Sequence, residues 1–285
     1  MSPTPRHPDG KQHRESPATQ GARRRWSGAR PCALLLALSL LLGLGAAAHA
    51  QEILVSAAIS LKEVAEELGR QFQQAHPGVT VRFNFGASGD LQKQIETGAP
   101  VDLFLSAGQR QMDALAQQRL LLPGSQRLVA RNALTLIVPA ASRLDLKSPQ
   151  DLGRPAVQRV ALGNPKTVPA GQYAEECLRS LGLWKALQPK LIFAENVRQV
   201  LEYVARGEVD AGFVYTTDLL SRPGAVREAA LLPQTSYSSI TYPGAVVGAS
   251  PQPALARAFL DLLGSPPGLQ VLARYGFQPP SSAGR

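Results

Sequence analysis

Short apolar runs alternate with amphipathic stretches from residue 52 to about residue 275, and this alternation restricts the possible folds more than any other feature of the chain. An apolar run of four to eight residues indicates a buried strand, whereas apolar residues at helical spacing indicate a helix that packs on a sheet. After the run at 52–57, for example, Leu61, Val64, Leu68 and Phe72 recur at spacings of three and four residues. The pattern is typical of α/β proteins with largely parallel sheets.

The alternation falls into two series that meet near residue 131, and further elements follow after about residue 235. This order predicts two Rossmann-like lobes with a hinge and a ligand cleft between them, and the cleft lies where strand C-termini and helix N-termini meet. Lobe 1 is predicted to comprise 51–131 plus 235–285, and lobe 2 to comprise 132–234. The predicted strands are 52–57, 79–85, 101–106, 133–138, 160–162, 190–193, 211–215 and 240–248. The predicted helices are 61–72, 90–96, 109–118, 171–181, 197–206, 253–263 and 267–275.

Residues 1–50 have the features of a cleavable secretory signal peptide. Basic residues at 23–25 and 30 precede an apolar run at 33–48, and small residues allow cleavage after Ala50. That run is shorter than the roughly 18 to 20 residues that a spanning helix needs, so we expect a periplasmic protein that does not itself span the membrane. Cys32 precedes the apolar run, where no lipid anchor is expected. The three arginines at 23–25 leave both general secretory and twin-arginine export open.

The composition of the mature chain argues against several classes of protein. Cleavage removes 7 of 30 basic and 2 of 21 acidic residues, which leaves 23 and 19 and hence a net charge of only +4. No basic run with interleaved aromatic residues follows residue 50, so a nucleic-acid partner is not expected. Cys177 is the one cysteine left, and its helical stripe predicts a buried small hydrophobe. His76, the one histidine left, is expected in a surface loop.

Four predicted strand-to-helix junctions bring small or hydroxyl residues to the first turn of a helix. The first N–H groups of a helix lack partners and its dipole end is positive, so such junctions favour anions. Ser60 with Glu63 also fits a capping box, and Asn196 fits a plain N-cap. The junctions are 57–60, 86–89, 168–171 and 195–198, two in each predicted lobe.

A cleft lined only by hydrogen-bond donors can hold a dianion without a lysine. Six or seven hydrogen bonds to a charged group, at about 1.5–3 kcal/mol each, return on the order of 10–20 kcal/mol against the cost of burying the charge. Donors alone also reject a protonated anion, whose O–H needs an acceptor. The residues therefore predict a site for a small oxyanion, with no cofactor and no cluster of protein side chains that ligates a metal.

The sequence resembles the periplasmic molybdate-binding component of ABC importers, a class II periplasmic binding protein family. The resemblance implies that the chain is a monomer and not an enzyme, and that it delivers molybdate, or tungstate, to an inner-membrane ABC permease. It also implies that Ser60, Ser88 and Tyr215 bind the oxyanion through hydroxyl groups, and Ala170 and Val197 through backbone N–H groups. The matching segments are VSAAISL at 55–61, FGASG at 85–89, QIETGAPVDLFLSA at 94–107, VPAG at 168–171, ENVR at 195–198 and YP at 242–243.

Several alternatives remain open at this point. Sulfate is also a tetrahedral dianion, and residues alone do not separate molybdate from tungstate. Organic-anion carriers commonly place an arginine against the ligand carboxylate, and Arg198 is the candidate. Lys166 is either a solvated loop charge or a contact to the closing lobe. A secreted serine hydrolase is the alternative from another class, but the segment around Ser88 departs from the G-x-S-x-G spacing and His76 is its one available imidazole.

Overall fold

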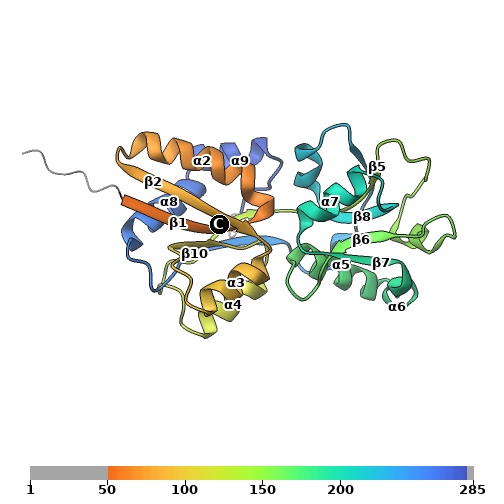
Figure 1. Cartoon of the computed structure of the whole chain (residues 1–285), viewed down its shortest axis with the longest axis horizontal. Coiled ribbons are helices and arrows are strands. Elements are labelled where there is room, and N and C mark those ends of the chain that lie inside the picture. The colour runs from red at the N-terminus through yellow and green to blue at the C-terminus, as the bar shows by residue number, and fades with distance from the viewer. Residues whose placement is uncertain (1–50, 281–285) are drawn as a thin grey trace, which may run out of the picture. The chain divides into compact units, whose positions relative to one another are not determined.

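A computed structural model describes residues 51–280 of the chain (Figure 1). The predicted signal peptide, with Cys32 and the cleavage position after Ala50, lies outside these residues. Within residues 51–280, none of the helices combines the length and the apolar character that crossing a membrane requires.

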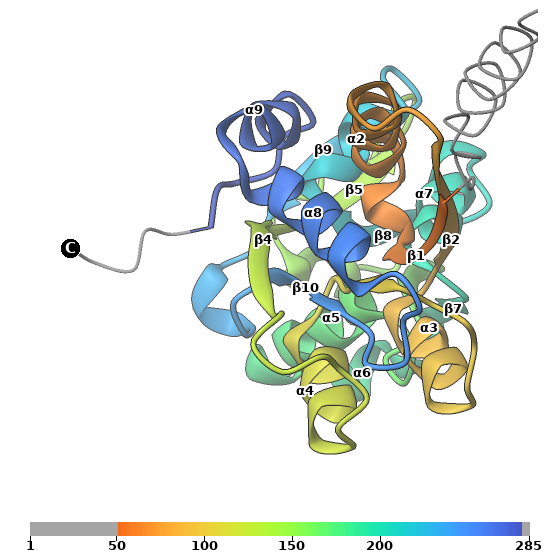
Figure 2. The same cartoon turned by 90° about the vertical axis from the view of Figure 1, so that its left-hand side faces the viewer.

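The first sheet has the strand order β2-β1-β3-β10-β4. Helices α2, α8 and α9 pack against one another on one face of it, whereas α3 and α4 cover the other face (Figure 2). The strands are β1 (Gln51–Ala58), β2 (Val79–Gly86), β3 (Leu103–Leu105), β4 (Arg127–Arg131) and β10 (Thr241–Val246). The helices are α2 (Lys62–Ala75), α3 (Ser88–Glu96), α4 (Gln109–Gln117), α8 (Pro253–Gly264) and α9 (Pro266–Arg274), and the 3-10 turn η1 (Ile59–Leu61) joins β1 to α2.

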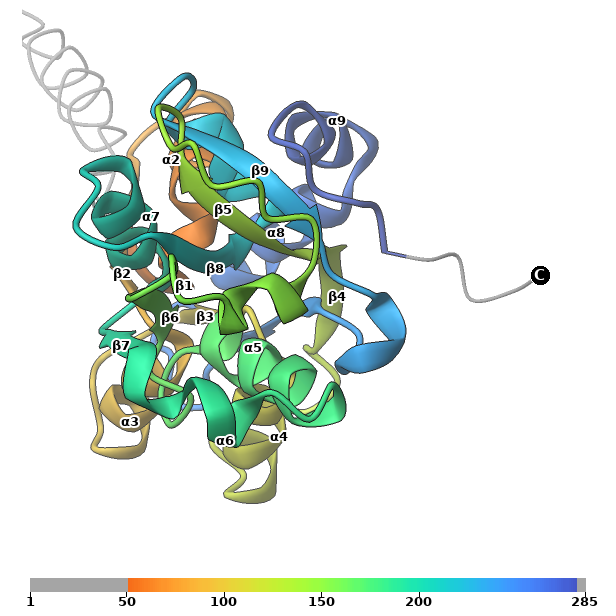
Figure 3. The ribbon, with the colours of Figure 1, turned by 90° about the vertical axis from the view of Figure 1, so that its right-hand side faces the viewer.

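The second sheet has the order β7-β6-β8-β5-β9. Helix α7 covers one face and α5, with the short α6 beside it, covers the other (Figure 3). The strands are β5 (Leu134–Pro139), β6 (Val160–Gly163), β7 (Leu191–Ala194), β8 (Ala211–Tyr215) and β9 (Val226–Leu231). The helices are α5 (Pro169–Ser180), α6 (Trp184–Leu187) and α7 (Val197–Ala205), with 3-10 turns η2 (Pro149–Gly153), η3 (Gln188–Lys190), η4 (Thr216–Ser221) and η5 (Gln234–Ser236).

Each sheet is mixed, but four of its five strands point the same way, so the expectation of largely parallel sheets is confirmed except for β10 and β5. Strand β1 pairs in parallel with β2 and β3, but β10 is antiparallel to β3 and β4. Likewise β6 is parallel to β7 and β8, but β5 is antiparallel to β8 and β9. The edge strands β4 and β9 were missed, because charged residues interrupt the apolar runs at 127–131 and 226–231 and edge strands expose part of their surface to water.

The chain passes between the two sheets twice, from β4 to β5 and from β9 to β10. The two connections touch, because the N–H of Asn132 donates to the carbonyl of Ile240 at 3.3 Å. The predicted lobe boundaries, 131/132 and 234/235, fall in these connections. We retain 51–131 plus 235–285 as lobe 1 and 132–234 as lobe 2, as a proposed division.

Candidate functional site: a cleft between the lobes

One small pocket is lined by loop and helix-start residues of both lobes. Its cavity volume is about 10 Å³, far below the ~300–1,000 Å³ typical of pockets for drug-sized molecules. The ligand must therefore be small. All five predicted binding residues line it: Ser60, Ser88, Ala170, Val197 and Tyr215.

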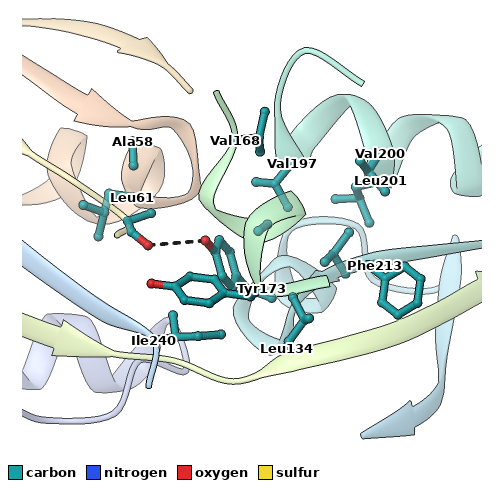
Figure 4. Close-up of a cluster of buried hydrophobic side chains, with 14 of the residues drawn as sticks. Ala58, Leu61, Leu134, Val168, Tyr173, Val197, Val200, Leu201, Phe213 and Ile240 are labelled. Atoms are coloured by element: carbon teal, nitrogen blue, oxygen red, sulfur yellow. Dashed lines mark hydrogen bonds between the residues drawn. The ribbon is translucent and has the colours of Figure 1, made fainter. Parts of the chain in front are cut away.

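The lining has polar side chains only at its three hydroxyl residues, and within the part of the chain that the structure describes it contains no charged residue. The remaining lining residues are small or apolar. Figure 4 shows buried apolar side chains around the pocket, with Ala58 and Leu61 of lobe 1 on one side and Val168 and Val197 of lobe 2 on the other. Low-dielectric walls of this kind strengthen each hydrogen bond made inside the cleft.

Strand direction explains why these residues meet. Parallel strands place their carboxyl ends at one edge of a sheet, and β1, β2, β6 and β7 each lead into a helix or turn at that edge. In this way the starts of η1 and α3 from lobe 1 face the starts of α5 and α7 from lobe 2. Tyr215, the last residue of β8, lies among them.

Ser88 is the first residue of α3 and is buried. Its Oγ accepts a hydrogen bond from the backbone N–H of Ala107 at 3.0 Å. An N–H group only donates, so the hydroxyl proton of Ser88 is not used in this contact. Ser88 is thereby arranged to donate to an acceptor in the cleft.

Ser60 does not form the predicted capping box. The turn η1 is inserted before α2, so that α2 begins at Lys62 with Leu61 at its N-cap and no side-chain cap. Ser60 Oγ instead lies 3.1 Å from the hydroxyl of Tyr242. Glu63 pairs with Arg198 of the other lobe.

The backbone donors of lobe 2 come from α5 and α7. Asn196 caps α7 as predicted, because its side chain accepts from the N–H of Gln199 at 3.0 Å. The N–H of Val197 belongs to the first turn and has no acceptor within the helix. Ala170 is the second residue of α5, which has no side-chain cap. Both residues line the pocket, so their N–H groups are suited to an anion.

Tyr215 is fully buried, and burial together with the neighbouring Tyr242 raises its pKa well above the ordinary value. The phenol is therefore neutral and can donate. Its hydroxyl lies 3.5 Å from the carbonyl oxygen of Ala107 in lobe 1, a distance at the limit of a hydrogen bond. A better acceptor in the pocket can take this proton.

Arg198 does not supply a positive charge to the pocket. Its guanidinium donates to both carboxylate oxygens of Glu63, at 2.9 and 2.7 Å, and its Nε lies 3.1 Å from Asp218 Oδ1. The pair with Glu63 joins the two lobes. The alternative of an organic-anion carrier depended on this arginine pointing into the cleft, so it loses its support. Lys166 is exposed in the loop before α5, which favours the solvated loop charge.

Within residues 51–280, the histidine, the cysteine and the acidic residues are not arranged for hydrolysis, thiol chemistry or metal binding. His76 lies in the short loop after α2, as predicted, where it is half-buried and stacks on Phe72 with ring centroids 4.0 Å apart. It does not line the pocket with Ser88. Cys177 is buried, as predicted, and burial raises its pKa. Residues 51–280 contain no group of three or more His, Cys, Asp or Glu side chains placed to hold a metal ion.

Asp218 predicts a measurable pH dependence of stability. Burial raises its pKa from 3.8 to about 6, although Arg198 opposes the shift. A carboxyl whose pKa is higher in the folded state stabilises the fold more as pH falls through that pKa. Between pH 7 and pH 5 this group should therefore add about 1 kcal/mol to the free energy of unfolding. Urea denaturation of wild type and Asp218→Asn at both pH values isolates the contribution, and equal pH dependence in the two proteins would contradict it.

Residues 53–278 match the family of bacterial extracellular solute-binding proteins. The chain belongs to this family. The solute-binding protein is 37% identical to the molybdate-binding protein ModA of Escherichia coli, over 85% of this chain and 94% of that one. Two of the similar solved structures carry the comparison further. The periplasmic molybdate-binding protein of Azotobacter vinelandii is 26% identical with a TM-score of 0.72, covering 80% of this chain and all of that one. The substrate-binding domain of a putative molybdenum ABC transporter from Clostridium difficile is 37% identical with a TM-score of 0.63, covering 81% and 99%. The predicted two-lobe α/β fold is confirmed.

Proposed function

We propose that this solute-binding protein captures molybdate, and tungstate with it, in the periplasm and delivers the anion to an inner-membrane ABC permease. The observation that carries the proposal is the pocket itself. Three hydroxyl groups and two helix starts from opposite lobes converge on a small space lined by no charged residue of the described chain. The molybdate-binding relatives from Escherichia coli and Azotobacter vinelandii support the choice of anion.

The proposed contacts are the hydroxyls of Ser60, Ser88 and Tyr215 and the backbone N–H groups of Ala170 and Val197. Five hydrogen bonds to a charged group stabilise the bound anion by roughly 8–15 kcal/mol in total. Helix N-termini add up to about 2 kcal/mol each where partly buried. A dianion can thus be held without a formal positive charge, and the lobes close over it by a hinge motion.

The same donor set explains why the protein acts as a carrier. A nucleophile needs a base within hydrogen-bond reach. Within residues 51–280, the hydrogen-bond neighbours of the Ser60 and Ser88 hydroxyls are a hydroxyl and a backbone N–H. We therefore propose that the chain binds its ligand unchanged, needs no cofactor, and works as a monomer.

Isothermal titration calorimetry of the mature chain with molybdate, tungstate, sulfate and phosphate tests the proposal. We expect tight binding of molybdate and tungstate at pH 7, weaker binding of sulfate and no detectable binding of hydrogen phosphate, because its O–H meets only donors. Sulfate binding as tight as that of molybdate would overturn the choice of anion. Absence of binding to all four anions would overturn the oxyanion assignment.

A further inference from the structure

Ser60 is linked to the hinge through two buried side chains. Tyr242 lies near the start of β10, directly after the second connection between the lobes, and its hydroxyl is 3.1 Å from Ser60 Oγ. Asn132 lies in the first connection, and its Nδ2 is 3.3 Å from the same tyrosine hydroxyl. All three residues are at most 6% exposed. Because water is excluded, each proton in this chain of contacts needs a protein or ligand acceptor.

At Asn132, the contacts show which atom of each hydrogen bond is the donor and which is the acceptor. Asn132 Oδ1 lies 2.9 Å from the backbone N–H of Ala133, which can only donate. It also accepts from the hydroxyl of Thr216 at 3.0 Å. The amide of Asn132 therefore cannot be turned over, and its NH₂ group must face Tyr242. The tyrosine oxygen is an acceptor in this contact.

The hydroxyl proton of Tyr242 then needs an acceptor. Burial raises its pKa far above the ordinary value, so the phenol stays protonated. Its other neighbours within residues 51–280 are Ser60 Oγ, at 3.1 Å, and the hydroxyl of the adjacent Tyr215. A buried donor without an acceptor is strongly disfavoured. Donation from Tyr242 to Ser60 would leave the Ser60 proton free to point into the pocket.

We propose that Asn132 and Tyr242 are positioning residues, which fix the Ser60 hydroxyl as a donor toward the bound oxyanion. The inference rests on the proposed function, and it extends the binding site to two side chains that do not line the pocket. The Ser88 hydroxyl is also fixed as a donor, but by the backbone, because its oxygen accepts from the N–H of Ala107. Ser60 depends on side chains, so its orientation can be changed by substitution.

A double-mutant cycle tests whether Tyr242 acts through Ser60. Molybdate affinity is measured by calorimetry for wild type, Tyr242→Phe, Ser60→Ala and the double variant. With serine at position 60, we expect Tyr242→Phe to weaken molybdate binding about tenfold, which is the effect of one hydrogen bond to a charged group. With alanine at position 60, the same substitution should weaken binding less than twofold. Asn132→Ala should weaken binding in the same way, and again only while Ser60 is present.

Tyr237→Phe is the matched control, because Tyr237 is buried and its hydroxyl accepts from the N–H of Leu134, away from the pocket. We expect less than a twofold change in affinity for it. Loss of affinity by Tyr242→Phe that is equally large with alanine at position 60 would overturn the inference, as would no loss at all. If wild type preferred sulfate, the molybdate assignment would fail, and the same cycle on sulfate would still decide the role of Tyr242.

Discussion

The Ser60→Ala/Ser88→Ala double variant is expected to bind molybdate roughly 10²–10⁴-fold more weakly than wild type, because each hydroxyl contributes about 1.5–3 kcal/mol to a charged acceptor. Both side chains are buried at the pocket, so water does not replace the lost donors. Calorimetry with the purified mature protein gives the ratio of dissociation constants. Each single variant should show about half of the loss in free energy.

Ser180→Ala/Ser238→Ala is a suitable control for that experiment. Both serines are exposed and neither lines the pocket, so the chemical change is the same while the cleft is untouched. Its affinity should equal that of wild type. If the Ser60→Ala/Ser88→Ala variant kept wild-type affinity while folded, the two hydroxyls would not be contacts of the anion, and the proposed binding mode would be wrong.

The sequence was most informative where buried strands lead into amphipathic helices. Strand β8 was predicted at its observed bounds, 211–215, and β2 to within one residue. Strand β8 is buried along its whole length, so its apolar run is continuous. Strand β2 is an edge strand, and its apolar residues alternate with exposed polar residues such as Thr80 and Arg82. Helix α3 begins at Ser88 rather than near residue 90, because its N-cap is Ala87 and its second residue is Gly89, neither of which marks a helix start strongly in sequence.

The contacts between distant segments were not predictable from the residues alone. Glu63 looked like part of a capping box, but its partner is Arg198, 135 positions further along the chain. The positioning role of Asn132 and Tyr242 likewise depends on the hinge, which brings the two connections between the lobes together. The spacing of residues in the sequence indicates which of them share a helix or strand. The contacts Glu63–Arg198 and Asn132–Tyr242 form only because the two lobes come together. The sequence indicated only that Asn132 and Tyr242 lie near the predicted hinge, and it gave no sign that they contact each other.

Closure of the lobes depends on one glycine. The N–H of Gly89, at the start of α3, donates to the carbonyl of Thr167 in lobe 2 at 2.9 Å. A Cβ on Gly89 would lie 2.6 Å from that oxygen and 2.7 Å from the Cα of Thr167. Both are backbone atoms, so no side-chain rotation relieves the contact. The lobes would have to separate, and hydrogen bonds from lobe 2 to the anion weaken steeply with distance.

Gly89→Ala should therefore reduce molybdate affinity by at least about 10³-fold, the effect of losing three donors of lobe 2 at about 1.5–3 kcal/mol each. Alanine favours a helix over glycine, so the unliganded protein should be at least as stable as wild type. Small-angle scattering should show no contraction on adding molybdate.

Gly264→Ala, where a Cβ meets nothing within 4 Å, is the control and should bind normally. Gly171→Ala should behave differently, because its Cβ would lie 1.9 Å from the carbonyl of Gly163 inside lobe 2 and destabilise the fold itself. Wild-type affinity in Gly89→Ala would show that the close approach of Gly89 to Thr167 is not needed for binding.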